Sequence, residues 1–366
     1  MLGSAFAGLS IGPSWLAGCP SLAASRSDDD QGHPTISLRQ TFKLKTPGGP
    51  TAVAWSPDGS SIAAASRYGQ DLSVWDRSGK MVSRFTIFGG GPYVSNSLAF
   101  VDGASRLIFH PPEKTDNDIS FVVWDVASGR SVESVTGPAP GANYPFNRAQ
   151  HFAVSPDQKL AVVVPYTGKA VAIYETKSWQ RIRVVDFPFQ ASSLCFFPDS
   201  RRIVLGAAVG GRWAVLDAAS GETSGPFVAY ERPEAIVGIG AVAVSPTGDL
   251  VLTGIGMVNL VGDAYRSPEV IAWSNSIGPA DIWRISDGSR VTSSPGAQAP
   301  IWQAVWDPKG RFIAFVDQKN RLFVARPSGA PITRIELQTA FSLAVAQDGD
   351  RLAVTNGNEL VIYEVF

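Results

Sequence analysis

Residues Thr51 to Phe88, TAVAWSPDGSSIAAASRYGQDLSVWDRSGKMVSRFTIF, contain the pattern that decides the fold. Ala52 to Trp55 is a short apolar run that ends at Ser56-Pro57-Asp58-Gly59. Pro57 restricts φ there and Gly59 can take a left-handed conformation, so this tetrapeptide predicts a tight turn. Three further strands are expected after it, at residues 62–66, 72–76 and 81–88. The segment therefore predicts a unit of short strands joined by turns.

The same turn recurs along the rest of the chain. Counted at positions 58, 102, 157, 199, 247, 309 and 348, the copies are 44, 55, 42, 48, 62 and 39 residues apart. The turn before the last strand recurs in phase, in WDVASGR, YETKSWQ, LDAASGE, WRISDGS and ARPSGAP, which end at residues 130, 180, 222, 289 and 331. Seven copies of a four-stranded unit predict an all-β fold, a seven-bladed β-propeller over residues 36–366.

Two dipeptides connect this repeat with a known family. Trp75-Asp76 and Trp124-Asp125 stand in the position of the signature dipeptide of WD40 repeats, and the spacing is similar to WD40 units of roughly 40–45 residues. The SPDG-type turns also resemble bacterial propellers of the TolB kind. No unit from residue 36 onward opens with the Gly-His dipeptide of a typical WD40 repeat. This leaves the subfamily open, and with it the Asp-His-Ser-Trp hydrogen-bond network of typical blades.

The two ends of residues 36–366 supply the strands that close the predicted ring. Leu360 to Phe366 has the pattern of the third strand of the seventh unit. Ile36 to Lys45 alternates apolar and polar residues before the first inner strand begins, which is typical of a half-exposed outer strand. We expect this N-terminal strand to complete the last blade, which leaves no unpaired terminal edge.

The segment before the propeller resembles an export signal. Residues 1–25 carry no charge and end in small residues, and Leu16-Ala17-Gly18-Cys19 resembles the lipobox of bacterial lipoproteins, which implies lipidation of Cys19. The absence of a basic n-region, and Gly12-Pro13-Ser14 in place of an apolar core, favour the alternative of a disordered tail. Residues 26–35 are polar and typical of a tether. The expected localisation is the bacterial cell envelope, periplasmic or lipid-anchored, with a cytoplasmic protein as the alternative.

The composition limits the classes of partner. A length of 366 residues with 45% hydrophobic and 17% charged residues suits one large all-β domain. The net charge is −1, whereas proteins that bind nucleic acids usually carry an excess of basic residues that contact the phosphates. Outside the N-terminal segment, the chain contains no apolar run of the roughly 18 residues that a membrane span needs. We expect a monomer that binds a protein partner and no nucleic acid.

Few residues in the sequence indicate catalysis. Cys195 lies inside an apolar inner strand, where burial is expected. His33, His110 and His151 are the only histidines, and no C-x-x-C, H-E-x-x-H or G-x-S-x-G motif accompanies them. The recurring turn aspartates suit turn hydrogen bonds. We therefore predict no catalytic residue, no metal and no cofactor.

The connections differ in length between the two faces of the predicted disc. Connections from first to second and from third to fourth strands are minimal turns, and they open on one face. Residues 89–95, 111–118, 136–150, 231–238 and 257–280 are longer than folding requires and fall on the opposite face, which is the candidate binding surface. They carry aromatic and arginine residues of the kind that dominate interfaces. The candidate binding residues are Tyr93, Tyr144, Phe146, Arg148, Tyr230, Arg232, Tyr265, Arg266 and Trp273. For each of them, packing of a loop against the blades is an equally open alternative.

These patterns favour a non-enzymatic protein-interaction scaffold. The alternative in another class is a propeller enzyme, either a lactonase-like hydrolase with a metal at the channel mouth or a quinoprotein-type oxidoreductase, because propellers host both classes. Glu113, Glu231, Glu234 and Asp263 fall on the long-loop face and could include a hydrolytic pair. An intracellular scaffold is the third interpretation.

Overall fold

A computed structural model describes residues 35–46, 48–66, 71–86, 97–109, 119–136, 149–165, 169–230, 235–260, 268, 280–294 and 299–366. Residues 36–366 form one compact unit, distinct from residues 1–35. The expected export signal with Cys19, and residues 26–34 of the expected tether, lie outside the described residues.

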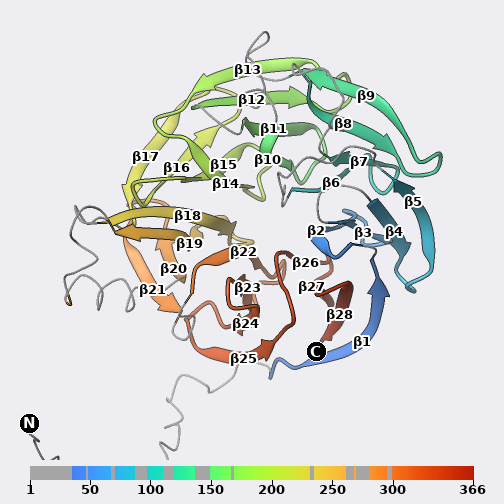
Figure 1. Cartoon of the computed structure of the whole chain (residues 1–366). Helices are drawn as coiled ribbons and strands as arrows, with labels where there is room; N and C mark the ends of the chain where they lie inside the picture. The colour runs from blue at the N-terminus through green and yellow to red at the C-terminus, as the bar shows by residue number, and fades with distance from the viewer. Residues whose placement is uncertain are drawn as a thin grey trace, which may run out of the picture. The chain divides into compact units, whose positions relative to one another are not determined.

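Residues 36–366 form a ring of seven antiparallel sheets, each with four strands (Figure 1). In blades 1 to 6 the strands follow each other from the centre outwards in chain order, and blade 7 has the order β26-β27-β28-β1. The all-β, seven-bladed propeller predicted from the repeat is therefore confirmed.

Each of the first six blades is built from four strands that are consecutive in the chain. Blade 1 contains β2 (Pro50–Trp55), β3 (Ser61–Ser66), β4 (Asp71–Asp76) and β5 (Met81–Thr86); blade 2 contains β6 (Ala99–Val101), β7 (Arg106–Phe109), β8 (Ile119–Asp125) and β9 (Arg130–Thr136). Blade 3 contains β10 (Ala149–Val154), β11 (Leu160–Pro165), β12 (Ala170–Glu175) and β13 (Arg181–Asp186); blade 4 contains β14 (Ala191–Phe196), β15 (Arg202–Ala207), β16 (Arg212–Asp217) and β17 (Thr223–Val228). Blade 5 contains β18 (Ala235–Val244), β19 (Leu250–Leu260), β20 (Ala280–Arg284) and β21 (Arg290–Ser294); blade 6 contains β22 (Ile301–Trp306), β23 (Ile313–Asp317), β24 (Arg321–Ala325) and β25 (Pro331–Glu336). Blade 7 contains β26 (Leu343–Val345), β27 (Arg351–Asn356), β28 (Glu359–Val365) and β1 (Leu38–Lys45).

The hydrophobic core lies between the blades. Seven apolar clusters are present, each made by the facing sides of two neighbouring blades. Because successive side chains of a strand point to opposite faces, β3 sends Ala63 and Ala65 towards blade 2 and Ile62 and Ala64 towards blade 7. A strand buried on both faces is apolar throughout, which explains the short continuous apolar runs of the second and third strands.

The ring is closed by the first strand of the chain, as the sequence predicts. β1 pairs antiparallel with β28, from Leu38 opposite Val365 to Lys45 opposite Glu359. The backbone N–H of Thr46 donates to the Asn358 carbonyl at 3.0 Å and extends this pairing by one more bond. The last blade is therefore made of three C-terminal strands and one N-terminal outer strand, β1.

The recurring turns are held by their aspartates, which confirms the structural role predicted for these residues. In the first turn the Ser56 hydroxyl donates to Asp58 Oδ1 at 2.6 Å, and the Ser60 N–H donates to the same oxygen at 3.0 Å. These hydrogen bonds, above all that from Ser56, lower the pKa of Asp58. In the turns where the repeat position holds Thr247 or Lys309, the carboxylate comes from Asp249 and Asp307 instead.

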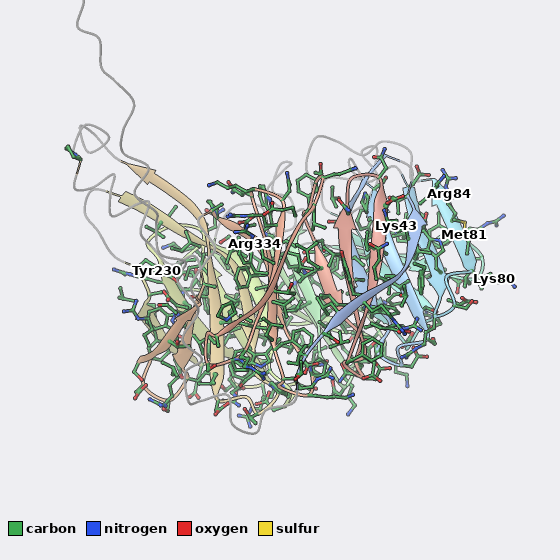
Figure 2. The ribbon with its side chains drawn as sticks, turned by 90° about the horizontal axis from the view of Figure 1, so that it is seen from below. Lys43, Lys80, Met81, Arg84, Tyr230 and Arg334 are labelled. Carbon is green, nitrogen blue, oxygen red and sulfur yellow. The ribbon has the colours of Figure 1, made fainter. Side chains whose placement is uncertain are left out.

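Blade 5 differs from the expectation in the length of its two inner strands. β18 and β19 have 10 and 11 residues and remain paired as far as Ala235 opposite Leu260, whereas β20 begins opposite Gly254. Residues 235–238 and 257–260 were expected to be loop, and that expectation is wrong, because the two segments satisfy each other's backbone groups in a β-ladder. Figure 2 shows this two-stranded ribbon projecting beyond the neighbouring strands.

Candidate functional site on the long-loop face and in the central channel

The ring has two faces that differ in their connections. The turn face carries the connections between first and second and between third and fourth strands, and the long-loop face carries the others. Of the predicted binding residues, Tyr230 is described; Tyr93, Tyr144, Phe146, Arg148, Arg232, Tyr265, Arg266 and Trp273 lie outside the described residues. The carboxylates Glu113, Glu231, Glu234 and Asp263 lie outside them too.

Tyr230 is a core residue between blades 4 and 5. Its side chain is 7% exposed, and its ring meets Trp283 edge to face, with centroids 6.2 Å apart. Burial, together with the neighbouring Asp281, raises the pKa of Tyr230 well above 10. Of the two roles left open for this residue, the structure shows the packing role.

A buried hydrogen-bond network surrounds Tyr230. The indole N–H of Trp283 donates to Thr253 Oγ1 at 2.8 Å, and the Tyr230 hydroxyl lies 3.5 Å from the same oxygen. Asp281 is 1% exposed, accepts a hydrogen bond from Ser293, and has a pKa that burial raises. These four residues therefore form one buried polar cluster between blades 4 and 5. Within the described residues, no other tryptophan indole donates to a protein group.

The polar groups of the turn face are largely occupied by each other. Arg77 pairs with Asp348 at 2.5 Å and Lys309 with Asp350 at 2.7 Å, so that ion pairs join blades 1, 6 and 7. Across the part of the chain that the structure describes, no three His, Cys, Asp or Glu side chains come close enough together to hold a metal ion. The turn face therefore stabilises the ring through its own contacts.

A cavity of about 550 Å³ lies in the central channel, lined by the inner strands β2, β10, β14, β18 and β22 and by residues near them. Burial lowers the pKa of His151 to about 4 and raises the pKa of the Cys195 thiol to about 11. At neutral pH the imidazole is therefore uncharged, and the thiol is protonated rather than activated as a nucleophile. Cys195 packs against the blade 4–5 core from the channel side, as a small apolar residue.

The inner strands share a bulge that shapes this cavity. In five blades one extra residue is inserted into the inner strand near its long-loop end, so that it has no partner in the ladder. The inserted residues are Thr51, Gln150, Ser192, Gly240 and Trp302. Ser192, Gly240 and Trp302 line the cavity. Strand patterns alone did not identify these residues, because a bulge breaks the alternation that assigns each side chain to a face.

Comparisons with known proteins agree with the repeat. Residues 38–76 match the family model described as WD domain, G-beta repeat. Two curated relatives are each named telomerase protein component 1. The protein of Rattus norvegicus is 23% identical over 345 residues, which are 90% of this chain and 11% of the relative. The protein of Mus musculus is 23% identical over 335 residues, 87% of this chain and 11% of the relative.

The matched chain thus spans about a tenth of the length of these relatives. The family match covers β1 to β4, including the Trp75-Asp76 dipeptide, and the relatives match across most of the ring. The chain is therefore a seven-bladed β-propeller in which residues 38–76 are similar to a WD40 repeat, and the relatives and the sheets support a WD40-type propeller.

Proposed function

We propose that this protein is a non-enzymatic scaffold that binds a protein partner on its long-loop face. The observation that carries the proposal is the difference between the two faces. On the turn face the connections are minimal and their carboxylates are bound to neighbouring backbone and side-chain groups. On the long-loop face the chain between β19 and β20 is 19 residues long, from position 261 to 279, and a two-stranded ribbon leads to it.

The comparisons support the same class of function. Both relatives are named as protein components of telomerase, a description that fits a part of a larger assembly. The polar residues described in the channel offer neither a metal-ligand cluster nor an ionised thiol.

The test replaces residues 261–279 with a Gly-Ser linker of the same length, which leaves β18, β19 and β20 intact. Quantitative co-purification from the native host should lose the partner with this variant and retain it with Lys80→Glu, an exposed change in the turn between β4 and β5 (Figure 2). Both variants should melt like the original protein. Retention by the linker variant, combined with loss on Lys80→Glu, would place the partner on the turn face.

The proposal extends to the location of the protein. The Leu16-Ala17-Gly18-Cys19 sequence supports export to a bacterial envelope with a lipid on Cys19. Across the described residues, no helix is both long and apolar enough to cross a membrane. Cys19→Ala should release the protein from the membrane fraction. Mass spectrometry of the protein without this substitution should find a lipid on Cys19. A free thiol on a chain that retains Met1 would contradict the anchor.

A further inference from the structure

One wall of the channel cavity carries a large apolar side chain, that of Trp302. Trp302 is 36% exposed although it belongs to an inner strand, because the bulge in β22 turns it out of the ladder and into the cavity. Its ring lies 5.9 Å from that of Phe341, at an interplanar angle of 55°. The corresponding bulge position of the neighbouring blade 5 is Gly240, which also lines the cavity.

The lining of the cavity is uncharged. The lining residues that the structure describes include no Asp, Glu, Lys or Arg, and His151 is neutral at pH 7 because burial lowers its pKa to about 4. Transfer of an ion into such a site without a counter-charge is costly, so the wall disfavours both anions and cations.

Most polar atoms of the wall are already bound to protein. The hydroxyls of Ser192 and Ser193 both donate to the Ile239 carbonyl, at 2.8 and 2.9 Å. Gln303 Oε1 accepts from the Ser342 hydroxyl at 2.6 Å and from the Leu343 N–H at 3.2 Å. Within the described residues, neither the Gln303 amide nitrogen nor the His151 ring has a hydrogen-bond partner. The wall thus retains an amide N–H donor beside Trp302, and a neutral imidazole.

We propose that this cavity binds a small uncharged aromatic molecule that carries a carbonyl or hydroxyl oxygen. The ring lies against Trp302, and the oxygen accepts a hydrogen bond from the Gln303 amide. A volume of about 550 Å³ is sufficient for one such molecule, since pockets of small ligands measure roughly 300–1,000 Å³. The proposal is independent of the protein partner on the long-loop face, because the two residues assigned to the ligand, Trp302 and Gln303, belong to the inner strand β22.

The test uses three ring compounds that differ mainly in charge: benzamide, benzoate and benzamidine. Ligand-observed NMR at pH 7 should show that benzamide binds at least tenfold more tightly than either ion. Trp302→Ala should weaken benzamide binding about tenfold or more, because the ring contact is lost. Ile182→Ala is the matched control, since Ile182 is an exposed apolar residue on β13 and outside the cavity; it should leave binding unchanged.

A second variant tests the hydrogen bond. Gln303→Glu keeps an acceptor for Ser342 and Leu343 but replaces the amide donor by a carboxylate, so the preference should change from benzamide to benzamidine. Thermal melts check that each variant is folded. Equal binding of the three compounds, unchanged benzamide binding by folded Trp302→Ala, or no benzamide binding at its solubility limit would overturn the proposal.

Discussion

The junction of blades 7 and 1 and the contact between blades 5 and 6 are held together in opposite ways. At the first, β1 completes blade 7, and on the turn face Arg77 pairs with Asp348 at 2.5 Å. At the second, the backbones of Gly240 and Gly256 in blade 5 meet each other and Ile301 of blade 6; a Cβ at Gly240 would lie 2.5 Å from Gly256 Cα and 2.8 Å from the Ile301 carbonyl oxygen. The first junction is stabilised by an extra strand and an ion pair, whereas the second requires glycines that have no side chain. Removal of groups should therefore destabilise the first junction, and addition of a methyl group should destabilise the second.

The largest effect is expected from removal of the closing strand. Deletion of residues 1–34 should leave the melting temperature unchanged, whereas deletion of residues 1–46 removes β1 and uncovers the edge of β28. The loss of Leu44 from the blade 7–1 core adds to this cost. We expect the longer deletion to lower the melting temperature by about 10 °C or more, since several kcal/mol are removed. Equal melting of the two truncations would show that β1 does not close the ring.

A second large effect is expected at the glycine contact. Gly240→Ala places a methyl group against backbone atoms that cannot rotate away, and should lower the free energy of unfolding by about 3 kcal/mol in urea titrations. Gly103→Ala is the control, because Gly103 has φ +69° but no atom within 4 Å of an added Cβ. It should cost about 1 kcal/mol for backbone conformation alone. If both variants lost the same free energy of unfolding, close packing would not explain why residue 240 is a glycine.

These two junctions also show what the sequence could predict. The closing strand was predictable, because the alternation of Ile36 to Lys45 and the three-strand pattern of the last unit are local features. The roles of Gly240 and Gly256 were not, since they depend on a bulge and on a carbonyl of another blade. Tyr230 illustrates the same limit, because an aromatic residue beside a long loop has the same local sequence whether it faces a partner or the core. The position of Trp302 could not be predicted, because it is the inserted residue of a bulge, and a bulge changes the side of the strand to which side chains point.

A pH-dependent effect is expected in the channel. Burial lowers the pKa of His151 to about 4, so between pH 6.5 and 4 the unfolded chain binds a proton that the folded protein excludes. The stability linked to this group is therefore complete above pH 6.5 and declines as the pH falls. At pH 5 the loss should be about 1–2 kcal/mol, given 1.36 kcal/mol per unit and some relief from channel water. Urea unfolding at pH 7.5 and 5 should show a smaller decline for His151→Gln than for the original protein. An identical decline would mean that the His151 pKa is near its ordinary value.

The smallest effect is expected at the exposed ion pair of the closing junction. The Arg77 and Asp348 side chains are 39% and 36% exposed, so solvent screens their attraction. A double-mutant cycle of Arg77→Ala and Asp348→Ala should give a coupling free energy of about 0.5 kcal/mol, which decreases as salt is added. A coupling above about 2 kcal/mol would show that the turn face contributes far more to ring closure than surface ion pairs usually do.

The central claim is that the turn face maintains the ring and the long-loop face binds the partner. Hydrogen–deuterium exchange of the protein alone and in complex with its co-purified partner measures both faces at once. We predict slower exchange on complex formation at residues 235–238 and 257–260 of the blade 5 ribbon, and no change in the turns at 56–60 and 77–80. Slower exchange in those turns, with the ribbon unaffected, would contradict the claim.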